Sequence, residues 1–164
     1  MYSVAASMKQ HRVRGKIVFV SSVLGFMGMV GYSQYAPMKY AIRGRLVRRS
    51  HMSGLAECLR MELQLHGIDV HAYFPATILS PGFEEENKTK PSLTKEIEGT
   101  DEGQTPEQCA AHLLRGIERH QFSVTDGVIG YFMRIASGGC APGHGWLGDT
   151  LLLLPARVGT IWLT

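Results

Sequence analysis

Runs of apolar residues along the chain predict two strands of a parallel sheet. Residues 17–20 (IVFV) are apolar and mostly β-branched and lie between Gly15 and a pair of serines, which is typical of a buried parallel strand. Residues 68–74 (IDVHAYF) alternate, with apolar side chains on one side, and predict the next strand. His71 in this segment is expected to be a polar residue at a strand edge rather than a ligand. The pattern predicts an α/β fold.

Apolar residues at helical spacing predict a helix before each of these strands. Residues 1–14 have this spacing and end in basic side chains, which suit a helix C-terminus. Residues 55–66 repeat leucines in the same rhythm and stop at Gly67, a residue type that commonly ends helices. The order of elements is therefore helix, strand, helix, strand.

A further helix has a complete start signal. Thr105 is the expected N-cap, Pro106 takes the first helical position and Gln108 completes a capping box. Four apolar residues behind this start predict the stripe that faces the core, namely Ala110, Leu113, Leu114 and Ile117. The segment 80–103 before it is polar and rich in turn-forming residues, so we expect a loop there.

The composition is that of an ordinary globular protein. Hydrophobic residues make up 45% and charged residues 19% of the chain, and the net charge of +3 is too small and scattered to indicate nucleic-acid binding. Three widely spaced cysteines without a CxxC motif favour a reducing compartment. The histidines lack the spacing of metal ligands, so no metal is assigned.

Candidate chemistry lies directly after the first predicted strand. Tyr35 and Lys39 are four residues apart, which puts both on one face of a helix, and Ser22 stands at the end of the strand. A phenol titrates near 10, and a nearby ammonium lowers that pKa by favouring the phenolate. The serine hydroxyl can meanwhile hydrogen-bond a substrate carbonyl oxygen. Together these groups suit carbonyl reduction.

The spacing of these residues resembles that of a known family. Ser22, Tyr35 and Lys39 match the S…YxxxK signature of the short-chain dehydrogenases/reductases. The words KIVFVSS, GYSQYAPMKYAI, GLAECLRMEL and PGFEEENKTKP resemble those of the fungal members that reduce 3-ketodihydrosphingosine. The resemblance covers roughly residues 15–164 with one interruption. It implies NADPH-dependent reduction of 3-ketodihydrosphingosine to dihydrosphingosine in sphingolipid synthesis, at the cytosolic face of the endoplasmic reticulum membrane.

The resemblance also assigns roles to individual residues. Ser22 would orient the ketone, Tyr35 would donate the proton, and Lys39 would lower the pKa of the phenol and hold the nicotinamide ribose. In the family, a turn after the second strand contacts the nicotinamide carboxamide. The residues at this position here are Pro75, Ala76, Thr77 and Ile78. The cofactor implied is NADPH.

The resemblance further implies partners. The substrate would be a long-chain keto sphingoid base, the endoplasmic reticulum membrane would be a second partner, and homo-oligomers would form through the helices beside the catalytic strand. Segment 80–103 takes the place of the family's mobile substrate loop. Its carboxylates at 84–86 fit either a solvated face or partners for the amino group of the substrate. Nucleic acid is not an expected partner.

One expected feature is missing after the predicted strands. This fold normally holds the cofactor's pyrophosphate at a glycine-rich turn between a strand and a helix, and no GxxxGxG or GxGxxG follows a strand here. We therefore expect residues 1–164 to be a partial reductase domain. It would be the C-terminal half of a Rossmann-like fold without the nucleotide-binding half, and inactive as an isolated chain. The alternative is a non-catalytic fragment that pairs with full-length reductase subunits.

Two segments depart from the family pattern. Residues 45–54 interrupt the helix that carries Tyr35 and Lys39, and ten residues turn a helix by about 1000°, which leaves the downstream face about 80° out of phase. Their arginines fit a patch for lipid headgroups or nucleic acid, or a translated non-coding stretch. Residues 146–164 are apolar in patches but interrupted by polar residues, which fits a membrane-interface tail or core packing rather than a spanning helix.

Overall fold

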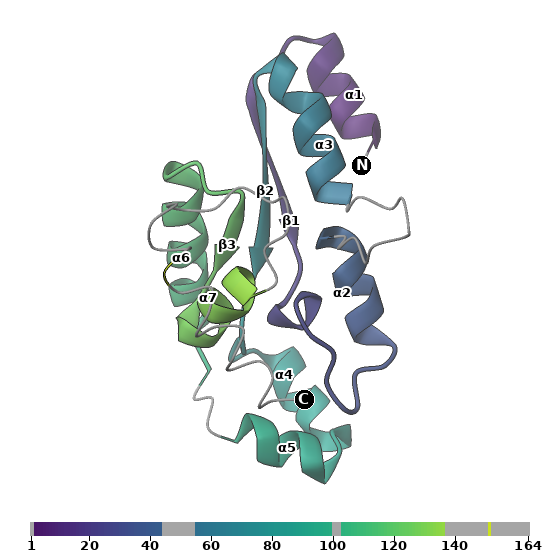
Figure 1. Ribbon diagram of the computed structural model, residues 1–164, viewed down its shortest axis with the longest axis vertical. Coiled ribbons are helices and arrows are strands. Elements are labelled where there is room, and N and C mark those ends of the chain that lie inside the picture. Colours follow the sequence, from purple (N-terminus) through teal and green to yellow (C-terminus); the bar gives the residue numbers. More distant parts are fainter. Residues whose placement is uncertain (1, 44–54, 100–102, 137–150, 152–164) are drawn as a thin grey trace.

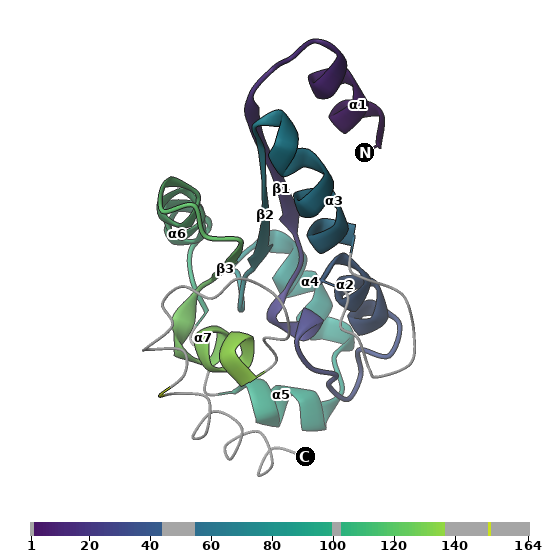
Figure 2. The ribbon, with the colours of Figure 1, turned by 45° about the horizontal axis from the view of Figure 1, so that its top comes forward.

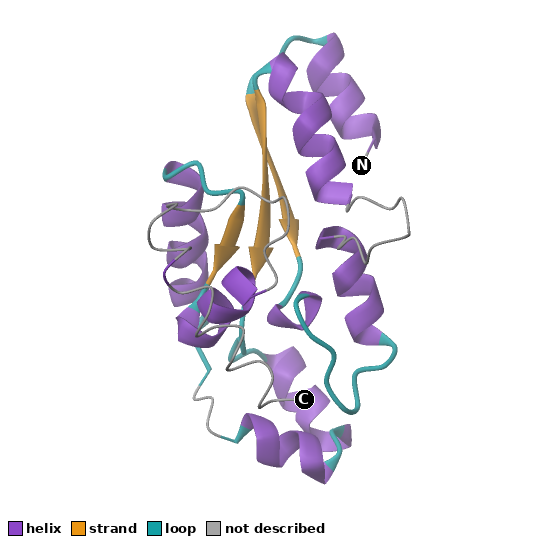
Figure 3. Ribbon diagram, viewed as in Figure 1, coloured by secondary structure: helices purple, strands orange, loops and turns teal. Residues whose placement is uncertain are grey.

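A parallel three-stranded sheet forms the centre of the molecule. The computed structural model describes residues 2–43, 55–99, 103–136 and 151. Its strands are β1 (Gly15–Val20), β2 (Ile68–Phe74) and β3 (Ser123–Thr125), in that order across the sheet. All three point the same way in Figure 3. The predicted α/β fold is confirmed, and the second predicted strand has the bounds that its alternation indicated.

Helices cover both faces of this sheet (Figures 1 and 2). The side of α1 and α3 also carries α2, α6 lies on the other side, and α4, α5 and α7 gather towards the carboxyl ends of the strands. The bounds are α1 (Tyr2–Gln10), α2 (Tyr35–Arg43), α3 (Leu55–Leu63), α4 (Pro81–Thr89), α5 (Ser92–Glu98), α6 (Pro106–Glu118) and α7 (Gly127–Ala136), with short 3-10 turns η1 (Val23–Gly25) and η2 (Gln64–His66).

The larger apolar core lies on the side of α1 and α3. It takes the alternate residues of β2 that the sequence pattern places on one side, and it adds Leu59 and Leu63 from α3. Phe74 and Leu59 are among the fully buried side chains, and truncating such a residue to alanine costs about 2–5 kcal/mol. A smaller core on the other side packs Tyr73 and Val124 against α6. Both faces of the sheet are therefore closed.

The end of the helix before β2 is confirmed. α3 tightens into η2, and Gly67 then adopts a φ of 68°, the left-handed conformation that favours glycine. The start of α6 is confirmed as well. The Gln108 amide donates to Thr105 Oγ1 at 3.3 Å, and the Thr105 amide donates to Gln108 Oε1 at 2.9 Å.

The apolar stripe predicted for α6 is wrong at two positions. Ala110 and Leu114 are exposed, whereas Cys109 and Gly116 are buried. A Cβ placed on Gly116 would lie 2.5 Å from Val124 Cγ2, so the absence of a side chain lets the helix approach β3 closely. Apolar periodicity missed this contact because a glycine has no side chain to be counted.

The position expected for His71 is also wrong. β2 is the central strand among the described residues, and His71 is 2% exposed. Its Nδ1 lies 2.7 Å from the carbonyl oxygen of Gln121, which can only accept, so Nδ1 carries the proton. No group of metal-ligating side chains occurs among the described residues.

The loop expected at 80–103 is instead largely helical. Ser80 caps α4, because its Oγ accepts from the Phe83 amide at 3.3 Å, and Pro81 takes the first helical position. α5 follows within three residues of the end of α4. The start signal was present in the sequence, and the polar composition of the segment hid it.

Two predictions lie outside the described residues. They concern the interruption at 44–54 and the tail at 146–164, of which only residue 151 is described. The flanking helices are described, since α2 ends at Arg43 and α3 begins at Leu55, and the two contact one another. Within the described part of the chain, none of the helices has the length and apolar character needed to cross a membrane.

Candidate active site

The two loops that carry Ser22 and Pro75 lie where β1 and β2 end, and the helix with Tyr35 and Lys39 docks on the first of these loops. The Ser21 amide donates to the Tyr73 carbonyl oxygen at 2.7 Å and continues the pairing of the two strands. Two residues later the Val23 amide donates to the Pro75 carbonyl oxygen at 3.0 Å. The loop with Ser22 and the loop that begins at Pro75 are therefore fixed to one another at the carboxyl ends of the strands, called the sheet edge below. Ligands bind at this end of open α/β sheets.

Ser22 takes part in the turn as a hydrogen-bond acceptor, and its hydroxyl donates to no other group among the described residues. Its backbone is extended (φ −164°, ψ 162°), and it caps η1 by accepting from the Leu24 amide on Oγ at 3.2 Å. A hydroxyl that accepts one hydrogen bond keeps its hydrogen for a second partner. Ser22 is half-buried, so this hydrogen can reach a ligand oxygen at the sheet edge.

Tyr35 and Lys39 lie together on α2. Tyr35 is the first residue of the helix and is 38% exposed. The ammonium nitrogen of Lys39 lies 5.1 Å from the centre of the Tyr35 ring, within the range of a cation–π contact. The i, i+4 prediction is thus confirmed as geometry, whereas the catalytic roles remain predictions.

Ser21 and Gly25 dock this helix on the end of β1. Ser21 Oγ donates to the Lys39 carbonyl oxygen at 3.0 Å. A Cβ on Gly25 would lie 2.8 Å from Ser21 Oγ and 3.0 Å from the Lys39 oxygen, so the bare glycine permits the close approach. The sequence places Gly25, with Gly28 and Gly31, in a loop beside the active site, but it does not indicate that Ser21 contacts Lys39. The serine pair was a visible signal, but its partner lies 18 residues away.

The turn at residues 75–78 is held on its far side too. The Gln104 amide donates to the Thr77 carbonyl oxygen at 2.9 Å, and the Leu79 amide donates to the Gln104 carbonyl oxygen at 2.9 Å. Ile78 and Gln104 form a parallel bridge. Pro75 is buried and the other three residues are half-buried. The structure thus places the four predicted residues in one fixed loop beside Ser22.

Below this edge lies a buried polar group that the sequence reasoning missed. The Tyr73 hydroxyl is 2.7 Å from Asp126 Oδ2 and 3.2 Å from the Cys109 carbonyl oxygen. Burial, followed by the hydrogen bond to Asp126, raises the pKa of Tyr73 far above its usual value, so the phenol stays protonated. Burial also raises the pKa of the Cys109 thiol. Neither side chain is poised to act as an anion at neutral pH.

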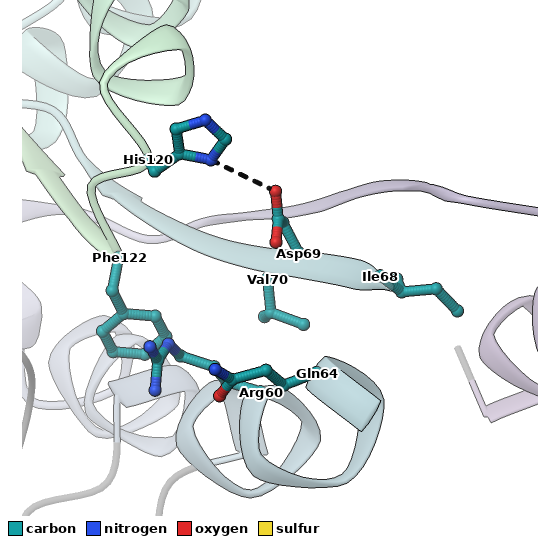
Figure 4. Close-up of a pocket in the computed structure, with 7 residues that line it drawn as sticks. All are labelled: Arg60, Gln64, Ile68, Asp69, Val70, His120 and Phe122. Atoms are coloured by element: carbon teal, nitrogen blue, oxygen red, sulfur yellow. Dashed lines mark ion pairs between the residues drawn. The ribbon is translucent and has the colours of Figure 1, made fainter. Parts of the chain in front are cut away.

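A pocket of about 220 Å³ lies at the opposite end of the strands (Figure 4). Asp69, at the start of β2, accepts from Lys16 Nζ at 3.0 Å and lies 3.4 Å from His120 Nδ1. The hydrogen bond from Lys16 is the main cause that lowers the pKa of Asp69. Because Ser22 follows the carboxyl end of a parallel strand, this pocket is not part of the site around Tyr35.

Comparison with known proteins gives a family for this arrangement. The family model described as short chain dehydrogenase matches residues 1–91, a range that includes every predicted site residue. The 3-ketodihydrosphingosine reductase of Cryptococcus neoformans var. neoformans is 42% identical over 94% of this chain and 44% of its own length. The 3-dehydrosphinganine reductase of Danio rerio is 38% identical over 85% of this chain and 39% of its own length. The chain thus spans less than half the length of these relatives.

Solved structures agree with the fold. A short-chain dehydrogenase from Burkholderia cenocepacia, in complex with NADP, matches 82% of this chain and 46% of its own with a TM-score of 0.58 at 16% identity. One from Sphingobium yanoikuyae, in complex with NADPH, matches 98% of this chain and 49% of its own with a TM-score of 0.58 at 21% identity. At such identities the likeness concerns the fold alone.

Proposed function

This chain belongs to the short-chain dehydrogenase/reductase family, and from that premise we propose that it carries the catalytic residues of a 3-ketodihydrosphingosine reductase. The relative so named in Cryptococcus neoformans var. neoformans aligns with 94% of the chain. The observation that carries the proposal is the pairing of the Lys39 ammonium with the Tyr35 ring, 5.1 Å apart, on the helix docked beside Ser22. The product is dihydrosphingosine, a precursor in sphingolipid synthesis.

Each of the three residues has a part in ketone reduction. The free hydrogen of the Ser22 hydroxyl donates to the ketone oxygen and orients it. Tyr35 gives its proton to that oxygen as the carbonyl becomes an alcohol, and the exposure of the phenol leaves room for the substrate. The Lys39 ammonium stabilises the phenolate that remains. The Pro75–Ile78 loop forms the neighbouring wall.

The cofactor in this proposal is NADPH, which supplies the hydride for the carbonyl carbon. The residues present fit its nicotinamide end, because the loop with Thr77 is hydrogen-bonded to the turn after β1, and the helix that carries Lys39 docks on that same turn. Neither a GxxxGxG nor a GxGxxG motif directly follows any of the three described strands. We therefore expect a nucleotide-binding segment, on the same or another polypeptide, to hold the pyrophosphate.

A joined chain tests the proposal. The N-terminal half of the Cryptococcus relative is fused to Met1, and NADPH oxidation is followed with the 3-keto base. We expect substrate-dependent oxidation. A well-folded joined chain that oxidises NADPH no faster with the keto base than without it would contradict the proposal. The 164-residue chain alone is the matched control, and we expect it to be inactive in the same assay.

A second candidate function is that of a subunit that pairs with reductase subunits. It is favoured by apolar side chains on the outer surface of α2 and α3, where Met38 is 67% and Met61 is 70% exposed. Sedimentation of the chain with and without the full-length relative tests it. If the chain sediments as a monomer both alone and in the presence of the full-length relative, this function is excluded.

We also propose that the protein works at the cytosolic face of the endoplasmic reticulum membrane. A long-chain lipid substrate supports this location, since such a molecule resides in bilayers. Fractionation of cells that express the chain with a fluorescent tag tests it, and recovery in the cytosolic fraction alone would contradict it.

A further inference from the structure

A group of aromatic and charged side chains ties α4 to the loop that leads into Tyr35. The Tyr32 hydroxyl donates to Glu86 Oε1, and Lys90 Nζ lies 3.3 Å from the same oxygen. The Lys90 ammonium also lies 4.7 Å from the centre of the Phe83 ring and 5.7 Å from that of Tyr32. These four residues, Tyr32, Phe83, Glu86 and Lys90, are called the Glu86 clasp below.

The clasp differs from an ordinary surface ion pair. In the clasp the Lys90 side chain is 2% and the Glu86 side chain 46% exposed, whereas in the neighbouring pair on α4 Lys88 is 68% and Glu85 is 73% exposed. A buried ammonium is stable only when a carboxylate or an aromatic face compensates for its lost hydration, and cation–π contacts strengthen when they are desolvated. The clasp therefore holds α4 in place in a way that the exposed pair does not.

A second contact fixes α5 to the same loop. Thr94 is completely buried, and its Oγ1 donates to the Val30 carbonyl oxygen at 2.9 Å. Gly31 next to it has a φ of 87° and packs closely against Pro91 and Thr94. The residues just before α2 are thus held by both helices of the segment 81–98.

The clasp continues into the candidate active site. The ring centres of Tyr32 and Tyr35 are 5.8 Å apart, and the Lys39 ammonium lies on Tyr35. A continuous series of contacts therefore runs from the Lys90 ammonium through the Tyr32 and Tyr35 rings to the Lys39 ammonium. These contacts form a continuous path from Glu86 and Lys90 through Tyr32 to the Tyr35 ring.

We propose that Tyr32 is a positioning residue, which through the Glu86 clasp holds α4 against the active-site loop and fixes the orientation of Tyr35. The proposal deepens the proposed function and rests on it, in that Tyr35 is taken as the proton donor. It also separates Glu86 from the other two acidic residues of its run, because Glu86 alone receives the Tyr32 hydroxyl.

Hydrogen exchange on the 164-residue chain tests the attachment of α4. Tyr32→Phe removes the hydroxyl and keeps the ring, and Glu86→Gln removes the charge that faces Lys90. We expect the amides of α4 and α5 to exchange roughly tenfold faster in both variants, because Tyr32→Phe loses one net hydrogen bond and Glu86→Gln loses the ion pair with the buried Lys90 ammonium. Glu85→Gln, one residue away in the exposed pair, is the matched control and should leave the rates unchanged.

The ring signal of Tyr35 tests the positioning itself. With ring-labelled tyrosine, assigned by Tyr35→Phe, we expect the Tyr35 resonance to move in Glu86→Gln and Lys90→Met but not in Glu85→Gln. Lys90→Arg keeps a positive charge that can contact the Phe83 and Tyr32 rings, so its Tyr35 signal should lie closer to that of the wild type than the signal of Lys90→Met. A structural role limited to α4 would change exchange and leave the Tyr35 signal in place.

Two results would overturn the proposal. One is the same exchange in α4 for the Glu86 and Glu85 variants, and the other is a Tyr35 signal that ignores both Glu86 and Lys90. Exchange in β1 and β2 reports whether each variant is folded, and if Lys90→Met unfolds, Tyr32→Phe and Glu86→Gln decide. Neither measurement depends on enzymatic turnover. A lack of activity on the keto base would therefore contradict the proposed function without affecting the test of the Glu86 clasp.

Discussion

Ser21 and Ser22 are neighbours in the sequence and serve different partners. Ser21 is buried and donates to the Lys39 carbonyl oxygen, whereas Ser22 is half-buried and keeps its proton. The first hydroxyl therefore places the helix that carries Tyr35, and the second is the one that we propose contacts the substrate. Adjacent residues of one type thus divide a structural and a chemical role.

The serine pair gives a prediction on stability. Ser21→Ala leaves the Lys39 carbonyl oxygen without its 3.0 Å partner in a close-packed contact, so it should lower the free energy of unfolding by about 1 kcal/mol. Ser22→Ala removes only a half-exposed cap of a short turn and should cost less. Urea unfolding of the chain followed by circular dichroism measures both. An equal loss in the two variants would contradict the division of roles.

A second prediction at the residue scale concerns Tyr35. Tyr35→Phe in the joined chain removes the proton donor and keeps the ring between Lys39 and Tyr32. General acid catalysis contributes about 10²–10⁴-fold, so kcat should fall at least that far while NADPH affinity changes little. Steady-state oxidation of NADPH with the keto base measures the rate. Equal rates in the two proteins would remove Tyr35 from the mechanism.

At the scale of elements, features that depend on neighbouring residues could be predicted from the sequence, whereas contacts between distant residues could not. The strand at 68–74 and the capping box of α6 were predicted, because each depends on residues close in the sequence. Tyr35 and Lys39 were paired for the same reason. The Glu86 clasp was not predictable, since Tyr32 and Glu86 are 54 residues apart and meet only when α4 docks. The buried face of α6 was misplaced because its closest contact is a glycine.

That glycine gives a prediction on packing. Gly116→Ala puts a methyl group where Val124 Cγ2 would lie 2.5 Å away, and the contact is with a β-branched side chain on a strand, which has little freedom to move. Overpacking of this kind costs about 1–3 kcal/mol, more than the helix gains from alanine. Thermal unfolding measures the change. Ala110→Gly on the exposed side of α6 is a control for helix propensity, and a more stable Gly116→Ala variant would contradict the close approach.

At the scale of the whole molecule, the sheet edge that carries the site is assembled from three separate parts of the sequence. The turn after β1, the loop after β2 and the helices α4 and α5 meet there. Each part is held by hydrogen bonds or buried contacts to residues far away in the sequence rather than by contacts with its sequence neighbours. This is why the site residues could be named individually from the sequence, but the way they are held could not.

The last prediction concerns the two helices on either side of residues 45–54. Ile42 of α2 and three residues of α3, namely Ala56, Leu59 and Leu63, pack in the same core. In the sequence, these three positions follow Ile42 by 14, 17 and 21 residues. Removing ten residues changes the separations to 4, 7 and 11 residues, which places all four side chains on one face of a continuous helix. Deletion of 45–54 should therefore leave the chain folded, with protected amides across the junction in hydrogen exchange, and should preserve turnover in the joined chain. Deletion of 45–53 is the matched control, since one residue more turns the stripe by about 100° and should destabilise the core. If the two deletions behave alike, helical phase does not decide how α2 and α3 pack.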